Sequence, residues 1–280
     1  MRKKIRLGDC SKIKVLMRRY RLNTVCEQAM CPNQGECFSR REVTFLILGR
    51  HCTRNCRFCN IDKHPPQPVD EGEPERVAEA ARLLGLRHVV ITSVTRDDLP
   101  DGGAYLFAKT ISCLKNTFPQ AKIEVLVPDF NLSYPAISMV LDACPHIFGH
   151  NVETVPSLYK YVRQGGDYLR SLKVLDFARR HSQQIYIKSS LLLGMGEKKE
   201  EVVSVMRDLL SVGCDFLSLG QYLAPSVRHY PVKEYITLQQ FEAYKDMALT
   251  MGFKYVHSAP YVRTSYCASD YLEAATKDGR

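Results

Sequence analysis

Six cysteines lie within residues 26–59, and they fall into two triplets with different spacing. The first triplet has the spacing C-x4-C-x5-C and the second C-x3-C-x2-C; their members are Cys26, Cys31 and Cys37, then Cys52, Cys56 and Cys59. Three thiolates that converge on one metal centre leave one coordination position open. Two such triplets close together therefore predict two metal centres with different tasks.

The second triplet is the more specific of the two. A C-x3-C-x2-C loop can bind three irons of a [4Fe–4S] cluster, because thiolates suit iron–sulfur centres and the short spacing lets one loop reach several irons. This pattern is typical of radical S-adenosylmethionine (SAM) enzymes, in which SAM binds the fourth iron and is cleaved to a 5′-deoxyadenosyl radical. The alternative is structural zinc, with His51 or His64 as a fourth ligand.

Composition favours an intracellular enzyme. The chain has 280 residues, with 45% hydrophobic and 25% charged residues, which suits one large globular domain. The first residues, Met1 to Lys4, lack the apolar stretch of a signal peptide, and no run reaches the length of a membrane span. Eleven cysteines in such a chain indicate metal ligation in a reducing compartment. We expect a soluble, cytoplasmic metalloprotein.

The net charge of +9 is concentrated near the N-terminus. Residues 1–21 contain one acid, Asp9, and nine bases: Arg2, Lys3, Lys4, Arg6, Lys12, Lys14, Arg18, Arg19 and Arg21. This basic arm could be a solvated helix face, a docking site for an acidic protein or a nucleic-acid contact. On the first interpretation, the residues at helical spacing that pack inward are Ile13, Leu16, Met17 and Tyr20.

The rest of the chain alternates short β-branched runs with amphipathic stretches. The runs predict strands over residues 44–48, 88–92, 122–127, 147–150, 185–190 and 216–219. The amphipathic stretches predict helices near residues 73–84, 104–117, 133–143, 168–181, 198–212 and 238–251. Six βα units predict an α/β fold, a partial (β/α)6 TIM-type barrel of the radical SAM type. We expect one domain, with residues 43–253 as the barrel and residues 1–42 and 254–280 as extensions.

Candidate cofactor-binding residues follow the predicted strands, where parallel barrels carry their chemistry. After the second strand come Asp98 and the pair Gly102 and Gly103, whose backbone could meet the methionyl amine of SAM. After the fourth strand, Asn151 and Glu153 offer an amide and a carboxylate suited to ribose hydroxyls or to that amine.

Three further candidates belong to the fifth and sixth strands. Lys188 lies among apolar residues within the fifth strand, which indicates a charged partner such as a carboxylate. Gln221 and Leu223 follow the sixth strand and could contact the adenine. Each signal is weak alone, but their recurrence at strand ends is what a barrel that binds a cofactor requires.

These motifs together resemble the lipoyl synthase family, over roughly residues 6–274. The resemblance rests on the two cysteine triplets with their neighbours, and on four further segments: residues 95–103, 151–154, 220–223 and the terminal Arg-Thr-Ser-Tyr of residues 263–266. The paired triplets and the terminal motif are more specific than a radical SAM motif alone.

The resemblance implies a radical SAM sulfurtransferase that converts an octanoyl chain on a carrier-protein lysine into the lipoyl cofactor. Two sulfur atoms enter, at C6 and C8, and one SAM is consumed at each position. The cluster on Cys52, Cys56 and Cys59 would cleave SAM. A second [4Fe–4S] cluster, on Cys26, Cys31 and Cys37, would give up both sulfurs, and its fourth ligand maps onto the hydroxyl of Ser265.

The implied partners are octanoylated lipoyl domains of 2-oxoacid dehydrogenase E2 subunits or the glycine cleavage H protein. An electron donor of the ferredoxin or flavodoxin type and an iron–sulfur carrier are also implied, whereas no nucleic acid or membrane is. The basic arm would then dock an acidic carrier domain.

Several positions depart from the family pattern. Thr264 stands where a serine is usual and Asn60 where an aspartate might be expected, and Cys267 occupies a position where we expect histidine. Cys267 is either a buried small residue or a thiolate that competes for the cluster. The remaining cysteines, Cys10, Cys113, Cys144 and Cys214, lack ligand spacing and are expected to be packing residues.

Two other functions stay open. One is another radical SAM sulfur-transfer enzyme that acts on tRNA or a small precursor. It would be expected to carry an added RNA-binding domain, for which the chain has no room. The other is a zinc adaptor without enzymatic activity, whose cysteines are structural and whose basic arm binds nucleic acid. Colour separates them, because iron–sulfur proteins are brown and zinc proteins are colourless.

Overall fold

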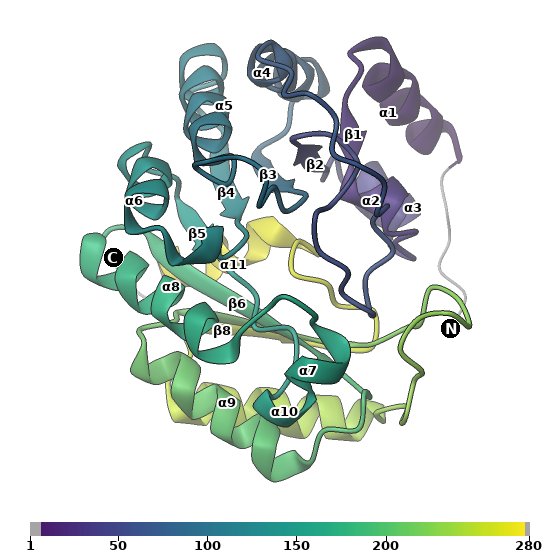
Figure 1. The fold of residues 1–280 in the computed structure, drawn as a ribbon, viewed down its shortest axis with the longest axis vertical. Coiled ribbons are helices and arrows are strands. Elements are labelled where there is room, and N and C mark those ends of the chain that lie inside the picture. Colours follow the sequence, from purple (N-terminus) through teal and green to yellow (C-terminus); the bar gives the residue numbers. More distant parts are fainter. Residues whose placement is uncertain (1–6, 278–280) are drawn as a thin grey trace. The chain divides into compact units, whose positions relative to one another are not determined.

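The computed structural model describes the backbone of residues 7–277 and side chains for residues 11–275. Its strands follow one another in chain order, from β1 to β4 and from β5 to β8, with helices between them (Figure 1). Contacts divide the chain into two compact units. The first comprises residues 1–53, 60–146 and 265–269, and the second residues 54–59, 147–264 and 270–280.

The first unit contains β1 to β4 and the helices that accompany them. Strands β2, β3 and β4 are parallel, and the two-residue β1 pairs antiparallel with β2. The strands are β1 (Asn23–Thr24), β2 (Thr44–Ile47), β3 (His88–Ser93) and β4 (Lys122–Leu126). The helices are α1 (Leu7–Arg19), α2 (Val25–Gln28), α3 (Gln34–Ser39), α4 (Glu73–Leu84), α5 (Ala104–Thr117), η1 (Phe130–Leu132) and α6 (Tyr134–Asp142).

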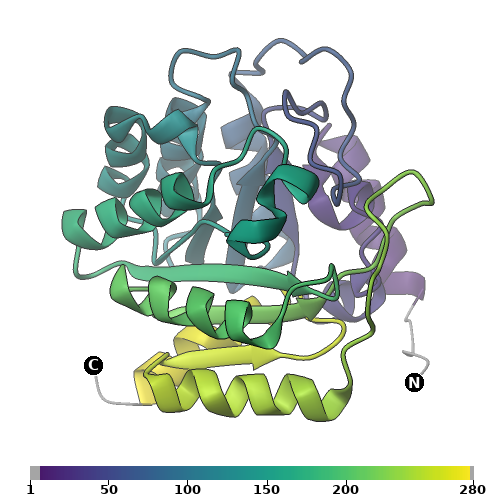
Figure 2. The same cartoon turned by 60° about the horizontal axis from the view of Figure 1, so that its bottom comes forward.

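The second unit contains β5 to β8, all parallel to their neighbours within the unit. The strands are β5 (Ile147–Gly149), β6 (Tyr186–Leu193), β7 (Phe216–Gln221) and β8 (Tyr255–Ser258). The helices are η2 (Pro156–Leu158), α7 (Tyr159–Val162), α8 (Tyr168–His181), α9 (Lys199–Ser211), α10 (Leu238–Met251) and α11 (Ala268–Lys277). Helices α9 and α10 lie along one face of these strands (Figure 2).

Local sequence explains where the principal helices begin and end. Helix α4 starts with an acidic first turn and a proline near its first position, and it ends at Gly85, which adopts a left-handed conformation with φ +60°. Helix α10 starts with a capping box in which the Thr237 hydroxyl accepts from the Gln240 amide and the Gln240 side chain accepts from the Thr237 amide. Because these signals are local, both helices have the predicted bounds.

All six predicted strands and all six predicted helices are confirmed, with bounds that differ by three residues or fewer. The short strands β1 and β8 were not predicted, since two- and four-residue strands carry little hydrophobic pattern of their own. The parallel series therefore extends one strand beyond the predicted six. The predicted division into a barrel with two extensions stays a prediction.

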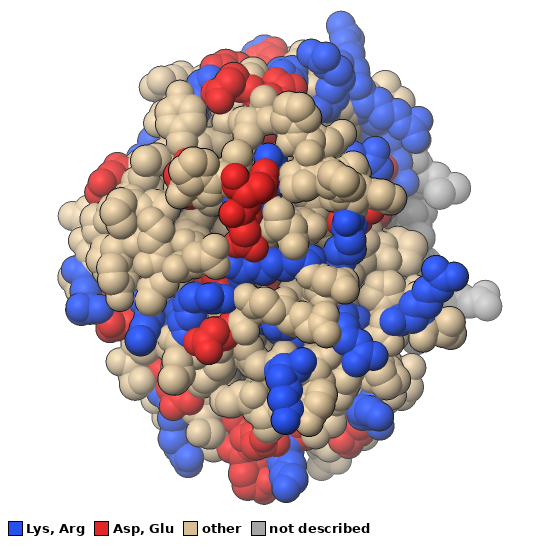
Figure 3. Space-filling model, viewed as in Figure 1, with Lys and Arg blue, Asp and Glu red and all other residues tan. Residues whose placement is uncertain are grey.

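Helix α1 carries the described part of the basic arm. Of the four residues predicted to pack inward, Ile13 and Met17 are buried and Leu16 and Tyr20 are half-buried. The basic side chains Lys12, Arg18 and Arg19 are exposed. Figure 3 shows basic side chains gathered over this helix at the upper right. The remaining arm bases, Arg2, Lys3, Lys4 and Arg6, lie outside the described residues. Among the described residues, no helix is long and apolar enough to cross a membrane.

Candidate functional site

The first cysteine triplet lies on two short helices of the first unit. Cys26 belongs to α2, Cys37 to α3, and Cys31 lies in the loop between them, where its amide donates to the Cys26 carbonyl at 3.0 Å. Cys26 and Cys37 are buried. The three thiols are close enough for their charges to interact, since the Cys26 and Cys31 thiolates each raise the pKa of Cys37. The structure therefore places the three thiols in the same part of the first unit.

Burial makes the thiols of Cys26 and Cys37 hard to ionise in the absence of a cation. It raises the pKa of Cys26 to about 12 and also raises the pKa of Cys37, to which neighbouring thiolates add. A positively charged metal centre inverts this preference, because it stabilises the deprotonated ligands. The chemistry of this donor set therefore fits an iron–sulfur cluster.

The terminal motif, residues 263–266, is followed by Cys267, and this segment contacts α3, the helix that carries Cys37. The Tyr266 hydroxyl donates to a carboxylate oxygen of Glu36 on α3 at 2.8 Å, and Arg40 Nη1 donates to Cys267 Sγ at 3.0 Å. Ser265 immediately precedes these two anchored residues and is partly buried. The segment predicted to supply the fourth ligand thus packs on the helix that carries Cys37.

Cys267 is buried, as the first of its predicted alternatives requires, and its competition for the cluster stays a prediction. Its side chain is only 4% exposed, so it is a buried residue. Its sulfur also accepts from Arg40 and raises the pKa of Cys37 electrostatically. It is therefore a fourth thiol beside the first triplet, held by a cation.

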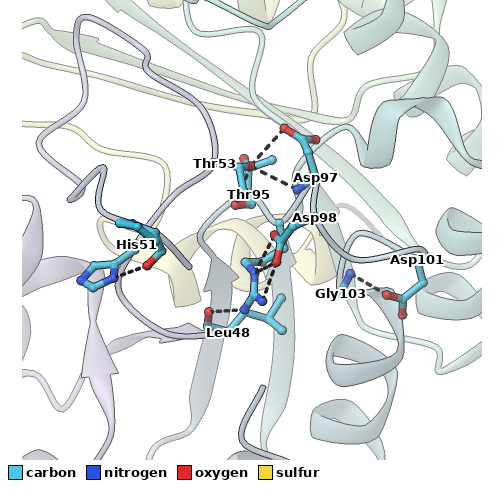
Figure 4. A network of polar contacts seen from close by, with 10 residues as sticks. Leu48, His51, Thr53, Thr95, Asp97, Asp98, Asp101 and Gly103 are labelled. Carbon is cyan, nitrogen blue, oxygen red and sulfur yellow. Dashed lines mark hydrogen bonds and ion pairs between the residues drawn. The ribbon is translucent and has the colours of Figure 1, made fainter. Parts of the chain in front are cut away.

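The loop that carries the second triplet leaves the end of β2 in the first unit. The Cys52 amide donates to the Asp62 carbonyl at 2.8 Å. The Thr53 hydroxyl is 3.0 Å from the Thr95 carbonyl and 3.1 Å from Asp97 Oδ2, so this loop is bound to the loop after β3 (Figure 4).

A buried arginine that sequence reasoning missed organises the loop after β3. Arg96 is 3% exposed, and its guanidinium donates to the Leu48 carbonyl at 3.2 Å and to both carboxylate oxygens of Asp98 (Figure 4). This ion pair holds the pKa of the Asp98 carboxyl below its usual value. The predicted cofactor residue Asp98 is therefore fixed in its charged form. The adjacent Arg-Asp-Asp sequence was the available signal.

The glycine pair after β3 has a packing reason. Gly103 has φ +90°, and a Cβ there would lie 2.2 Å from Cδ1 of Leu48. Gly102 has φ +61°, and a Cβ there would lie 3.0 Å from the Phe130 ring. The Gly103 amide donates to Asp101 Oδ1 at 2.9 Å, which starts α5. The two glycines bring this turn close to the end of β2, next to the cysteine loop.

The other two cysteines of the second triplet belong to the second unit. The Cys59 amide donates to the Cys56 carbonyl at 3.2 Å, which closes a tight turn. The neighbouring Arg57 amide donates to the Val162 carbonyl at 2.8 Å. Arg163 interacts electrostatically with Cys56, so a cation lies near this ligand.

Asn151 and Glu153, at the end of β5, form one polar cluster in the second unit. Asn151 Nδ2 donates to Glu153 Oε1 at 3.0 Å and to the Thr264 hydroxyl at 2.8 Å. Arg163, which sequence reasoning did not identify, donates to the Asn151 carbonyl at 2.7 Å. Within the described residues, Asn151 Oδ1 is buried and has no hydrogen-bond partner. A buried acceptor in this position fits a ligand donor such as the SAM amine.

Burial raises the pKa of the Glu153 carboxyl, and Arg163 and the Asn151 amide oppose that shift. Glu153 also has φ +66°, a left-handed conformation for a residue with a side chain. Its backbone is held there, because its amide donates to the Ser190 carbonyl at 3.0 Å and its carbonyl accepts from the Leu192 amide at 2.8 Å. The backbone of Glu153 is thus held by β6, and its carboxylate accepts from Asn151.

The other predicted cofactor residues of this unit have partners within the protein, and their contact with a cofactor stays a prediction. Lys188 in β6 is fully buried, and its ammonium lies 3.6 Å from the centre of the Tyr271 ring, a cation–π contact. Gln221 donates to the Leu193 and Glu234 carbonyls and accepts from the Ile236 amide. Its amide therefore secures the segment that follows β7, which begins with Tyr222 and the partly buried Leu223.

Known proteins resemble this chain at two levels. A family model described as the radical SAM superfamily matches residues 46–209. The lipoyl synthase of Citrifermentans bemidjiense is 53% identical over 98% of this chain and 94% of that protein. The lipoyl synthases of Caldicellulosiruptor saccharolyticus and Aquifex aeolicus are 55% and 52% identical, over 91% and 93% of this chain and 90% and 94% of theirs.

Solved structures share the fold at low sequence identity. Streptococcus suis SuiB bound to S-adenosylmethionine has a TM-score of 0.62 at 11% identity and covers 81% of this chain and 53% of that one. HydG, a maturase of the [FeFe]-hydrogenase, has a TM-score of 0.60 at 14% identity. The match covers 89% of this chain and 64% of HydG. With the full-length identity above, these matches place the chain by both fold and sequence: it belongs to the radical SAM superfamily and, within it, to the lipoyl synthase family.

Proposed function

We propose that this chain inserts two sulfur atoms, at C6 and C8, into an octanoyl chain attached to a lysine of a lipoyl carrier protein, using the cysteines and the serine described above. The observation that carries the proposal is the return of the terminal segment to α3, through the contacts of Tyr266 with Glu36 and of Cys267 with Arg40. Radical SAM enzymes in general need only the second triplet, whereas sulfur insertion needs a second cluster with its own ligands.

The ligands of the two clusters are assigned as follows. The auxiliary [4Fe–4S] cluster would be held by Cys26, Cys31, Cys37 and Ser265, and the cluster that binds SAM by Cys52, Cys56 and Cys59. When bound, these groups supply a deoxyadenosyl radical that removes one hydrogen at each carbon, and two sulfur atoms from the auxiliary cluster.

The fourth ligand explains how one cluster can be spent. An alkoxide is a harder ligand than a thiolate and holds iron less well. A serine at position 265 therefore lets iron leave as sulfur is transferred, whereas a fourth cysteine would keep the cluster intact. Cys267, two residues away, is kept from this role in our proposal by its contact with Arg40.

The residues that would hold SAM act by position and charge. Asn151 Oδ1 and the Glu153 carboxylate would accept from SAM or its ribose, and the turn at Gly102 and Gly103 would approach its methionyl group. Asp98 would keep that turn in place through Arg96, since both of its carboxylate oxygens are engaged there. Lys188, Gln221 and Leu223 are proposed to line the same site, with Gln221 acting as a positioning residue for the segment after β7.

The substrate and partners follow from the activity. Lipoyl synthesis implies an octanoylated lipoyl domain of a 2-oxoacid dehydrogenase E2 subunit or the glycine cleavage H protein as substrate. We assign its docking to the exposed bases Arg18, Arg19 and Arg21, which suit an acidic carrier. A ferredoxin or flavodoxin would supply electrons and an iron–sulfur carrier would rebuild the spent cluster. A cytoplasmic location follows from the need to keep the cysteines reduced.

The test is an anaerobic reaction of the reconstituted protein with SAM, a reductant and an octanoyl-lysine peptide, followed by mass spectrometry of the peptide. We expect the peptide to gain two sulfurs while 5′-deoxyadenosine forms. Deoxyadenosine without sulfur on the peptide would show that either the substrate or the auxiliary cluster is misassigned. Absence of both products, with both clusters verified by iron content, would overturn the proposed activity.

A matched pair of serine variants tests the fourth ligand. Ser265→Ala should still form deoxyadenosine but lose sulfur transfer, because the auxiliary cluster lacks its serine ligand. Ser269→Ala removes a hydroxyl from the same segment, one that lies 3.4 Å from Glu42, and should keep wild-type transfer. Equal transfer by both variants would contradict the assignment of Ser265.

A further inference from the structure

Three metal-ligating side chains lie outside the cysteine triplets, at the two ends of the second cysteine loop. His51 immediately precedes Cys52, whereas Asp62 and His64 follow Cys59. One ligand atom from each of the three lies within 4.8 Å of the others. We propose that His51, Asp62 and His64 form a site for a divalent transition metal, with Zn²⁺ as the expected occupant.

The backbone brings two of these ligands together before any metal binds. His51 and Asp62 form a parallel β-bridge, and the amide of Cys52 donates to the carbonyl of Asp62 at 2.8 Å. Their side chains therefore start from adjacent positions on two paired segments. Because of this pairing, less conformational entropy is lost when a metal binds.

The His51 ring is oriented as in many metal-binding histidines. Its Nδ1 lies 2.9 Å from the Pro65 carbonyl (Figure 4), and a carbonyl can only accept, so Nδ1 carries the hydrogen. The other ring nitrogen, Nε2, then has a free lone pair, and it lies 3.9 Å from Asp62 Oδ2. A backbone carbonyl that fixes the tautomer is the usual support of a ligating imidazole.

The third ligand already contacts the second. His64 Nδ1 is 2.5 Å from Asp62 Oδ1, a hydrogen bond whose proton a metal ion can replace. A tetrahedral zinc site with bonds of about 2.0 Å separates its ligand atoms by roughly 3.3 Å. The 3.9 Å between His51 Nε2 and Asp62 Oδ2 therefore needs to close by about 0.6 Å, and the 2.5 Å between His64 and Asp62 needs to open by about 0.8 Å. The side chains of Asp62 and His64 are 47% and 74% exposed, so they have room to adjust.

Two imidazoles and a carboxylate are a ligand set for zinc and neighbouring divalent metals, and they leave a fourth position for water. Binding would connect His51, before Cys52, to Asp62 and His64, after Cys59. The metal would therefore hold together the two ends of the loop that carries the second triplet. On binding, the proton of His64 Nδ1 passes to solvent and no electron is transferred. The inference does not depend on the proposed function, because none of the three ligands is a cysteine.

The test uses untagged holoprotein with both clusters loaded, so that the cysteines are occupied. The protein is dialysed anaerobically against Zn²⁺, and bound zinc and iron are counted by mass spectrometry. We expect one zinc per chain in the wild type. His64→Gln, which retains a donor for Asp62, should weaken zinc binding by at least roughly tenfold, since loss of a ligand exceeds loss of its supporting hydrogen bond. His181→Gln, at the exposed end of α8, should not change it.

Zinc X-ray absorption gives an independent readout. A first shell of nitrogen and oxygen at about 2.0–2.1 Å with imidazole scattering is expected, whereas sulfur at about 2.3 Å would place the zinc on cysteines. Sulfur in the shell would overturn the proposal, as would the absence of bound zinc in the wild type. Equal zinc binding by the His64→Gln variant would overturn it as well.

Discussion

Gly103→Ala should destabilise the first unit much more than an alanine at another left-handed glycine. Gly103 has φ +90°, and its added Cβ would lie 2.2 Å from Cδ1, 3.2 Å from Cδ2 and 3.3 Å from Cγ of Leu48. Carbon atoms normally pack at about 3.5–4.0 Å, so the buried Leu48 side chain must move. The matched control is Gly85, with φ +60° and an ordinary distance of 3.5 Å to Arg41 Nη1.

Both substitutions lower the free energy of unfolding by placing an alanine in a left-handed conformation, but only Gly103→Ala adds a steric clash. A left-handed alanine costs about 1–2 kcal/mol at either site. The clash at Gly103 adds the cost of overpacking, about 1–3 kcal/mol. The expected loss is therefore about 2–5 kcal/mol for Gly103→Ala and about 1–2 kcal/mol for Gly85→Ala.

Thermal unfolding of the cluster-loaded protein under anaerobic conditions measures the difference. At about 2–4 °C per kcal/mol, the Tm of Gly103→Ala should fall several degrees further than that of Gly85→Ala. In a Leu48→Ala background the clashing methyls are gone, so the extra cost of Gly103→Ala should disappear. Equal Tm values for the two glycine variants, or an unchanged extra cost in that background, would refute the steric reasoning.

Three further predictions concern buried groups. Burial raises the pKa of Glu73 to about 7. The unfolded carboxyl therefore loses its proton first as pH rises, and the free energy of unfolding should fall between about pH 4.5 and 7 by up to roughly 3 kcal/mol. Glu73→Gln should lack this fall, and parallel curves for the two proteins would contradict it. Cys267→Ala should leave the iron content unchanged if Ser265 is the ligand; loss of iron would assign the thiolate instead. Tyr271→Phe keeps the ring under the Lys188 ammonium and should lower the free energy of unfolding by about 1 kcal/mol, because the hydroxyl contact is lost. Tyr271→Leu also removes the ring and should lower it by at least about 1 kcal/mol more. Equal unfolding midpoints of the two variants in urea would contradict the cation–π contact.

Sequence reasoning was most accurate where the signals are local. The capping box at Thr237 and the glycine at position 85 set helix ends within a few residues of themselves, and both helices have the predicted bounds. It failed on β8, whose four residues are held by pairing with β7 and by no pattern of their own. It also missed Arg96 and Arg163, because a buried arginine is recognised only by the partners that surround it.

The partners of Lys188 and Gln221 within the protein illustrate the same limit, whereas the contact of these residues with a cofactor stays a prediction. Both were predicted to face the cofactor because of their residue type and strand position. The ring of Tyr271, 83 residues later in the chain, contacts the first, and the carbonyl of Glu234 contacts the second. Such partners come from other parts of the chain, and nothing in the strand's own sequence identifies them.

The sequence by itself determined the order of βα units, the family and the two cysteine triplets, because spacing within a short loop constrains which thiols can reach one cluster. The tertiary structure decided which distant groups join them. Tyr266 meets Glu36 across 230 positions, and Arg40 meets Cys267 across 227. It also decided that His51 and His64 face Asp62. The physical reason is that periodicity and capping act between near neighbours, whereas contacts across the chain depend on how whole elements pack.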